Sequence, residues 1–256
     1  MLKGKTALVT GSTSGIGLGI AQALAAQGAN LVLNGFGDID GARAAVAAHG
    51  VEVDYHGADM SRPDQIADMM AFAAGRFGRI DVLVNNAGIQ HVSRIEQFPT
   101  ERWDAILAIN LSSAFHTTRL ALPAMRAAQW GRIINIASVH GLVASAEKSA
   151  YVAAKHGLVG LTKVTALETA SSGVTCNAIC PGWVLTPLVQ AQVDARALAQ
   201  GVSPEEAKRQ LLGEKEPSMQ FTTPAELGAL AVFFCSAAGD NVRGVAWNMD
   251  GGWTAQ

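Results

Sequence analysis

The sequence predicts an α/β fold in which about seven parallel strands form a doubly wound sheet with helices on both faces. Short aliphatic runs alternate along the chain with longer, alanine-rich segments of helical spacing. The strand candidates are continuously apolar, which is typical of strands buried on both faces. The length of 256 residues fits one such domain, so we expect residues 1–256 to form a single domain.

The elements follow in order. Strands are predicted at residues 6–10, 30–33, 51–56, 82–85, 132–137, 174–179 and 245–248. Helices are predicted at residues 17–27, 65–77, 102–128 and 151–171.

A charged insertion interrupts this alternation at about residues 188–216. Within it, Ser203-Pro204-Glu205-Glu206 has the signature of a helix start, with an N-cap serine and a proline at the first helical position. Thr223-Pro224-Ala225-Glu226 repeats the signature for the next helix. We expect a helical lid on the carboxyl side of the sheet, where ligands bind in such folds. A solvated helical hairpin is the alternative.

The composition argues against several kinds of binding partner. With 19 Lys and Arg against 21 Asp and Glu, the formal net charge is −2, which argues against nucleic acid and anionic membranes as partners. No apolar run reaches the roughly 18 residues of a membrane span, and the N-terminal residues do not resemble a signal peptide. The three cysteines lack metal-ligand spacing. We therefore expect a cytoplasmic protein with reduced cysteines and no metal.

Two glycine-containing turns follow predicted strands. The turn Gly11-Ser12-Thr13-Ser14-Gly15-Ile16-Gly17 lies between the first strand and first helix, where glycines let a pyrophosphate approach backbone amides and the helix N-terminus. Asn85-Asn86-Ala87-Gly88 closes the fourth strand and could hold a cofactor ribose, although it could also be a simple turn.

Tyr151 and Lys155 lie four residues apart, so a helix places them on one face. A fixed ammonium favours the phenolate form, so we expect Lys155 to tune Tyr151 for proton transfer near neutral pH. Ser138, at the end of the preceding strand, could present its hydroxyl to the phenol.

Together these motifs resemble the short-chain dehydrogenases/reductases. The two turns, the Ser138, Tyr151 and Lys155 set, Pro181-Gly182 and the terminal Asp250-Gly251-Gly252 follow the family's order over nearly the whole chain. The resemblance implies a Rossmann fold with Tyr151 as general acid/base, Ser138 holding the substrate oxygen and Lys155 also bonding the nicotinamide ribose. Asn110 matches the family position of a proton relay, with a buried structural amide as the alternative. The implied cofactor-binding residues are Gly11, Thr13, Ser14, Gly15, Ile16, Gly17, Phe36, Asp59, Met60, Asn86, Ala87, Gly88, Tyr151, Lys155, Pro181, Gly182, Val184 and Thr186.

The end of the second strand favours NAD over NADP. Neither Asn34-Gly35-Phe36 nor Ser12-Thr13-Ser14 contains the Arg or Lys that a 2′-phosphate needs. The acidic residue most common in NAD-binding members is also missing, since Asn34-Gly35-Phe36 stands there instead.

Side chains around the catalytic set favour a small carboxylate substrate. Gln90, His140, Lys148 and Gln192 can all donate hydrogen bonds, and Trp183 and Trp253 could form an apolar wall. With Ser138 and Tyr151 they resemble the substrate site of family members that oxidise (R)-3-hydroxybutyrate to acetoacetate with NAD, and the resemblance also implies a homotetramer. The alternatives are an NADPH-dependent 3-oxoacyl carrier-protein reductase and a non-catalytic dinucleotide sensor.

Overall fold

The protein, a computed structural model, contains one seven-stranded parallel sheet in the order β3-β2-β1-β4-β5-β6-β7. The structure describes residues 1–255; Gln256, the last residue of the predicted domain, lies outside them. The strands are β1 (Thr6–Val9), β2 (Asn30–Leu33), β3 (Val53–Tyr55), β4 (Val82–Asn85), β5 (Gly131–Ile136), β6 (Val174–Pro181) and β7 (Ala246–Met249). The predicted fold class is thereby confirmed.

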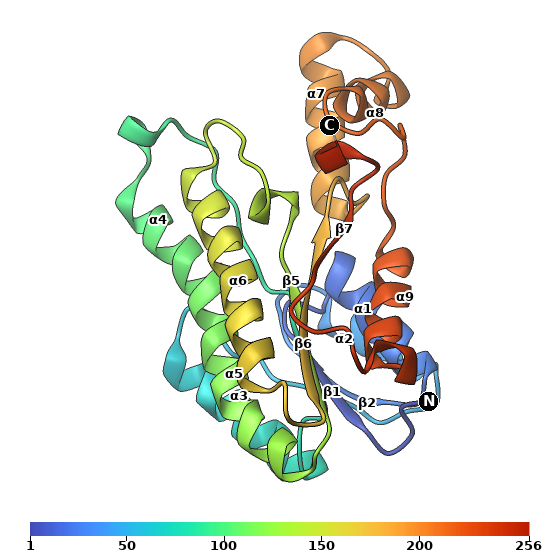
Figure 1. Cartoon of the computed structure of the whole chain (residues 1–256). Coiled ribbons are helices and arrows are strands. Elements are labelled where there is room, and N and C mark those ends of the chain that lie inside the picture. The colour runs from blue at the N-terminus through green and yellow to red at the C-terminus, as the bar shows by residue number, and fades with distance from the viewer. Residues whose placement is uncertain (256) are drawn as a thin grey trace.

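Helices cover both faces of the sheet. In Figure 1, α1, α2 and α9 lie on one side, and α3, α4, α5 and α6 lie on the other. The helices are α1 (Gly15–Ala26), α2 (Ile39–Ala47), α3 (Pro63–Phe77), α4 (Thr100–Leu107), α5 (Ser113–Ala127), α6 (Ser149–Glu168), α7 (Pro187–Gln200), α8 (Pro204–Gly213) and α9 (Pro224–Cys235). Apolar side chains such as Ile20, Leu24 and Phe234 on one face, and Ile66 and Met69 on the other, bury both faces of the strands.

The segment predicted as one helix over residues 102–128 contains a π-turn. Residues Ala108–Ser112 form this turn between α4 and α5, and Asn110 lies in it, 2% exposed. A π-turn adds one residue to the helix and is frequent at functional sites, because it redirects a side chain without ending the helix.

The insertion forms two helices, α7 and α8, that project above the sheet in Figure 1. The side chains of Thr186 and Ser203 cap them by accepting hydrogen bonds from Val189 N and Glu206 N. The helices bury a small apolar cluster of their own, whose members are Val189, Val193, Ala197, Ala207 and Leu211. The lid prediction is confirmed as to position and helical structure.

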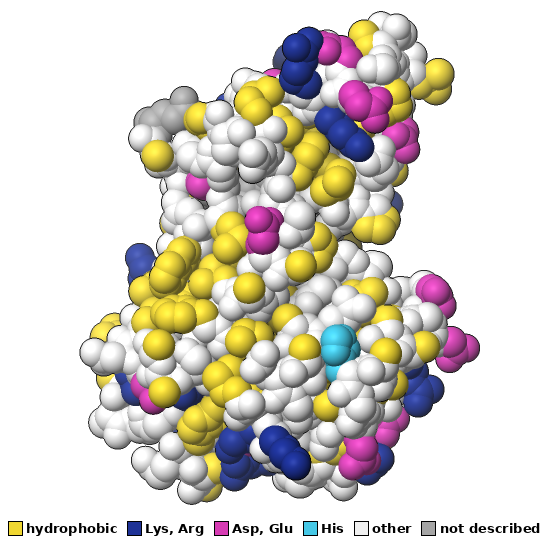
Figure 2. All heavy atoms as spheres, turned by 90° about the vertical axis from the view of Figure 1, so that its right-hand side faces the viewer, with side chains coloured by type: hydrophobic (Ala, Val, Ile, Leu, Met, Phe, Trp, Pro, Cys, Tyr) yellow, Lys and Arg dark blue, Asp and Glu magenta, His cyan; other side chains and the backbone are white. Residues whose placement is uncertain are grey.

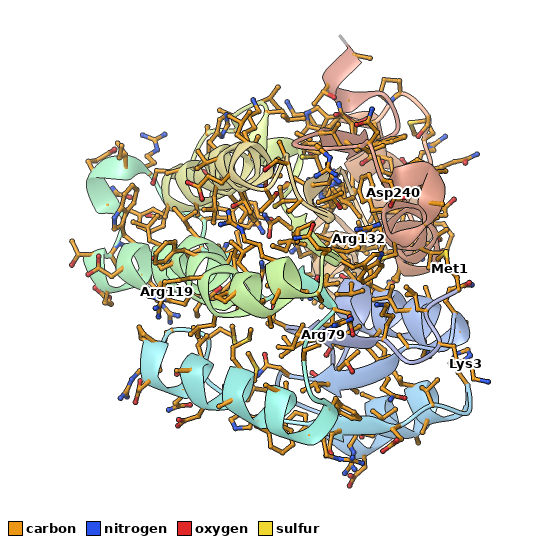
Figure 3. The ribbon with its side chains drawn as sticks, turned by 60° about the horizontal axis from the view of Figure 1, so that its bottom comes forward. Met1, Lys3, Arg79, Arg119, Arg132 and Asp240 are labelled. Carbon is orange, nitrogen blue, oxygen red and sulfur yellow. The ribbon has the colours of Figure 1, made fainter. Side chains whose placement is uncertain are left out.

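Charged side chains gather on the lid and at the edge of the sheet opposite the lid. At the opposite edge the buried Arg132 pairs with Asp240, and Arg79 pairs with Asp81 (Figure 3). Figure 2 shows charged residues mainly on the lid and along the lower rim, with a band of hydrophobic and uncharged side chains between them. Within residues 1–255, no helix is both long and apolar enough to cross a membrane.

Candidate active site

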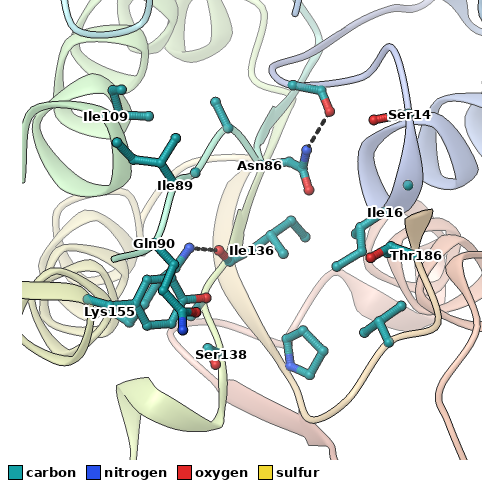
Figure 4. Close-up of a pocket in the computed structure, with 18 of the residues that line it drawn as sticks. Ser14, Ile16, Asn86, Ile89, Gln90, Ile109, Ile136, Ser138, Lys155 and Thr186 are labelled. Carbon is teal, nitrogen blue, oxygen red and sulfur yellow. Dashed lines mark hydrogen bonds between the residues drawn. The ribbon is translucent and has the colours of Figure 1, made fainter. Parts of the chain in front are cut away.

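A cavity of about 520 Å³ lies at the carboxyl ends of the strands. The strand order reverses between β1 and β4, and the crevice at such a switch point is where ligands bind in open α/β sheets. Figure 4 shows Ser14, Ile16 and Thr186 on one side of the cavity and Asn86, Ile89 and Gln90 on the other. The lid and the C-terminal segment complete its wall through Gln192 and Trp253.

The β1–α1 turn needs glycine for both conformation and space. Gly11 and Gly15 have φ angles of +61° and +54°, which side chains rarely adopt. A Cβ on Gly17 would overlap the carbonyl oxygen of Gly11, so this glycine lets helix α1 approach the turn. The turn therefore exposes its backbone atoms to the cavity beside the N-terminus of α1.

The turn after β4 is fastened to the turn after β1. The Thr10 hydroxyl accepts hydrogen bonds of 3.0 Å from both Asn86 N and Ala87 N. The Asn86 Nδ2 group donates in return to the carbonyl oxygens of Thr10 and Gly11, at 2.8 and 2.9 Å. One of these bonds is drawn in Figure 4. The Asn-Asn-Ala-Gly sequence thus holds the two turns in fixed relation across the cavity.

The end of β2 forms the far end of the cavity. Asn34 is buried, and its Nδ2 donates to the carbonyl oxygens of His56 and Ala58 at 3.0 and 2.9 Å. The Thr13 hydroxyl donates to the carbonyl oxygen of Phe36 at 2.5 Å, while the Phe36 side chain is 72% exposed at the rim. Asn34 therefore ties strand ends together, and this end of the described lining carries no Lys or Arg.

Ser138, Tyr151 and Lys155 come together at the centre of the cavity, as predicted. Ser138 ends the segment after β5, and Tyr151 and Lys155 lie one turn apart on α6. The Lys155 Nζ lies 5.6 Å from the centroid of the Tyr151 ring and donates to the carbonyl oxygen of Ile136 at 2.7 Å (Figure 4). The backbone of β5 thereby fixes the ammonium beside the phenol.

Burial of Tyr151 acts against the tuning expected from Lys155, which stays a prediction. Burial raises the pKa of Tyr151 above its ordinary value, because the phenolate would lose its hydration, and the Ser138 side chain opposes this only in part. Burial also lowers the pKa of Lys155 to about 8, so the cation itself is weakened. The protein alone thus keeps Tyr151 as the neutral phenol.

His140 and Lys148 lie at the substrate end. The His140 Nδ1 faces the Ser138 hydroxyl at 3.4 Å, and its Nε2 lies 2.9 Å from the Ser145 hydroxyl. Burial, together with the charge of Lys148, lowers the pKa of His140 to about 4, so the imidazole is neutral at pH 7. Burial also lowers the pKa of the half-buried Lys148. Its ammonium lies 5.7 Å from the Trp183 ring centroid.

Aromatic rings form the wall predicted for Trp183 and Trp253. Their centroids are 6.4 Å apart, and Trp253 also contacts His140 edge-on at 5.5 Å. Gln90 and Gln192 reach the same cavity from the turn after β4 and from the lid. All eight predicted substrate residues therefore line one cavity.

Two predicted site residues lie outside the lining. Gly17 lies behind the β1–α1 turn, where it serves packing. Asn110 lies one layer behind the cavity, and its amide exchanges two 2.9 Å hydrogen bonds with the backbone of Ile89. These bonds are those expected of a buried structural amide, and the relay role of Asn110 stays a prediction. The other predicted cofactor residues all line the cavity.

The sequence did not single out several apolar lining residues. Ile89, Ile109, Ile136 and Val189 contribute to the wall. Each follows or precedes a recognised motif, but an aliphatic residue at such a place cannot be distinguished from a core residue by sequence alone. Among residues 1–255, no three His, Cys, Asp or Glu side chains gather as metal ligands would.

Comparisons with known proteins agree with this geometry. The chain is 71% identical to a D-beta-hydroxybutyrate dehydrogenase of Cupriavidus necator over 100% of both chains. It is 54% identical to the D-beta-hydroxybutyrate dehydrogenase of Rhizobium meliloti, covering 98% of this chain and 99% of the relative. The crystal structure of a single-substitution variant of actinorhodin polyketide ketoreductase with NADPH superimposes with a TM-score of 0.92 at 33% identity, covering 100% of each chain. Residues 5–197 match the family described as short chain dehydrogenase. The chain therefore belongs to the short-chain dehydrogenase family.

Proposed function

We propose that this protein oxidises (R)-3-hydroxybutyrate to acetoacetate with NAD, reversibly. The observation that carries the proposal is the joint placement of Lys148, His140, Gln90 and Gln192 around the Ser138 and Tyr151 hydroxyls in one cavity. An ammonium and several neutral donors suit a carboxylate, and the hydroxyl pair suits an alcohol or ketone oxygen nearby. Two relatives named D-beta-hydroxybutyrate dehydrogenase support the same substrate.

The cavity fits a nicotinamide dinucleotide. A glycine turn at a helix N-terminus suits a pyrophosphate, and a Cβ at Gly11 would lie 3.0 Å from the Ala87 Cα, so only a glycine leaves this approach open. The residues that would hold the dinucleotide are those of this turn, Asp59 and Met60, the turn after β4, Lys155, and Pro181, Gly182, Val184 and Thr186. When bound, the nicotinamide supplies the hydride acceptor for oxidation.

We favour NAD because the adenosine end of the described lining lacks a cation. The two lysines of the lining, Lys148 and Lys155, both lie at the substrate end, and Phe36 occupies the rim where a 2′-phosphate would need Arg or Lys. The ketoreductase neighbour carries NADPH, so the family itself does not decide the choice.

The residues at the substrate end have separate roles in binding and proton transfer. Lys148, with Gln90 and Gln192, binds the substrate carboxylate, and the aromatic wall excludes water from the short carbon chain. Ser138 donates to the reacting oxygen. Tyr151, once ionised to the phenolate, takes the alcohol proton during oxidation, and as the phenol it returns that proton during reduction. Because burial keeps the free phenol protonated, oxidation is expected to speed up as pH rises.

Steady-state rates with (R)- and (S)-3-hydroxybutyrate, each with NAD and NADP, test the proposal. We expect a high kcat/KM only for the R isomer with NAD. A preference for an acetoacetyl thioester with NADPH would instead support a 3-oxoacyl reductase, the second candidate; the ketoreductase neighbour also carries NADPH.

We also propose that residues 1–256 act as one domain and assemble as a homotetramer. Exposed apolar side chains support the assembly: Phe115, Val164 and Leu167 on α5 and α6 are 48, 52 and 78% exposed, and Trp247 on the edge strand β7 is 42% exposed. A cytoplasmic location stays a prediction.

A further inference from the structure

Glu216 is a buried carboxyl at the end of the lid, and the mechanism above does not use it. It is 1% exposed and lies three residues after α8, where the chain leaves the lid. Its Oε1 accepts a hydrogen bond from the backbone N–H of Trp183, while its Oε2 is buried with no hydrogen-bond partner among residues 1–255. Burying a carboxyl costs free energy, so we expect a carboxyl at this position to have a specific role.

Glycines shape a cradle around this carboxyl. A Cβ on Gly182 would overlap the Glu216 Oε1, and a Cβ on Gly251 would lie 3.3 Å from Oε2. Any side chain at Gly182 would therefore displace the carboxyl. Since Gly182 belongs to the segment after β6 and Gly251 to the C-terminal segment, Glu216 contacts two segments distant in sequence.

The same two segments carry the aromatic wall. Trp183, whose backbone N–H donates to Glu216, lies near both the Lys148 ammonium and the Trp253 ring. Trp253 follows Gly251 by two residues, and the Ser218 N–H donates to the Gly251 carbonyl oxygen at 3.0 Å. In Figure 1 the C-terminal turn correspondingly lies against the lid. Glu216 and its neighbours thus join the lid exit to both tryptophans.

We propose that Glu216 is a positioning residue for the substrate end: by holding the Trp183 backbone, it sets the indole against which Lys148 and the carbon chain of the substrate lie. This proposal rests on the proposed function and extends it, because it assigns part of the substrate affinity to a residue that is not in the cavity lining. The β1–α1 and β4 turns, which hold most of the dinucleotide site, do not contact Glu216, since they are fastened to one another by Thr10 and Asn86.

The charge of the group is consistent with this role. Burial raises the pKa of Glu216 to about 7, and the nearby Asp250 carboxyl acts in the same direction, while the Trp183 N–H opposes it. A carboxyl with this raised pKa is partly protonated at pH 7 and repels the anionic substrate less than a fully ionised one would, while its oxygen still accepts from Trp183. A glutamine should therefore replace it with little loss.

The test compares Glu216→Leu, which removes the acceptor, with Glu216→Gln, which keeps it. Glu205→Leu, at an exposed position of the same lid, is the matched control. We expect Glu216→Leu to raise the KM for (R)-3-hydroxybutyrate about five- to fiftyfold, the range for losing one buried hydrogen bond. Glu216→Gln and Glu205→Leu should stay within about threefold of wild type, and the dissociation constant of NADH, followed by fluorescence, should stay within about twofold throughout.

Each other outcome is decisive. An unchanged KM in Glu216→Leu overturns the proposal, and so does an equal KM increase in Glu216→Gln, or a parallel loss of NADH binding, which would indicate a general structural role. If Glu216→Leu does not fold, Glu216→Asp takes its place, because withdrawing the carboxyl by one methylene should also raise the KM. If wild-type enzyme binds NADH but fails to oxidise 3-hydroxybutyrate, the proposed function fails instead.

Discussion

Replacing Lys148 by methionine should separate carboxylate recognition from catalysis. Methionine keeps an apolar stem beside Trp183 and removes the ammonium. Two unit charges about 4 Å apart interact by about 4 kcal/mol at an effective dielectric constant of about 20. Because Lys148 is only half-buried, part of this is lost to solvent, and we expect a loss of about 2–4 kcal/mol. That corresponds to a decrease of about 30- to 1000-fold in kcat/KM for (R)-3-hydroxybutyrate.

A neutral alcohol makes the measurement specific. Initial rates with (R)-2-butanol, which lacks the carboxylate, should be low in wild type and unchanged in Lys148→Met. Lys3→Met is a matched control, since Lys3 is exposed near the opposite edge of the sheet (Figure 3). Equal losses on the acid and the alcohol would refute the assignment, because they would mean that Lys148 supports the site as a whole. The pKa of His140 should also rise above about 4, since the Lys148 charge helps to lower it.

Three further substitutions test the remaining proposals. Tyr151→Phe should lower kcat about 10²- to 10⁴-fold while NADH still binds, whereas a non-catalytic sensor would have no turnover to lose. Phe36→Arg should raise kcat/KM with NADP at least about tenfold by offering its phosphate a cation, and no gain in an NADP titration would place the adenosine ribose elsewhere. Leu167→Glu should reduce the mass measured by light scattering, whereas Leu198→Glu, on the lid and 87% exposed, should not; equal masses would argue against an α6 interface.

Much of the fold could be predicted because its signals are local. Strands β2 and β4 have the predicted bounds, since each is a continuous apolar run closed by turn residues. Helix α2 was missed because residues 39–47 are short and contain glycine, so the helical pattern is weak. The π-turn at 108–112 was missed because one inserted residue leaves the apolar spacing almost unchanged.

The same difference between local signals and long-range contacts decides which site residues could be predicted. Most residues that contact the cavity lie in short motifs at strand ends, and the sequence identified most of them but missed aliphatic residues such as Ile89 and Ile136. The sequence named Asn110 but could not decide between its two roles, and it did not identify Glu216, because burial and hydrogen-bond partners decide what these residues do. Glu216 follows Glu214 and Lys215, so the sequence there reads as a solvated charged run. Its burial arises only when the lid exit lies against the C-terminal segment.

The electrostatics of the cavity explain why one lysine should select the substrate. His140 is neutral, because burial and the Lys148 charge lower its pKa to about 4, and Tyr151 is neutral, because burial raises its pKa. Lys155 has a pKa of about 8, and its ammonium already donates to the carbonyl oxygen of Ile136 on β5. Lys148 is then the cation of the described lining that is available to a carboxylate. Neutral hydrogen-bond donors around a single cation orient a bound carboxylate without adding further positive charge. This combination suits a small monocarboxylate better than an uncharged ketone or a dianion.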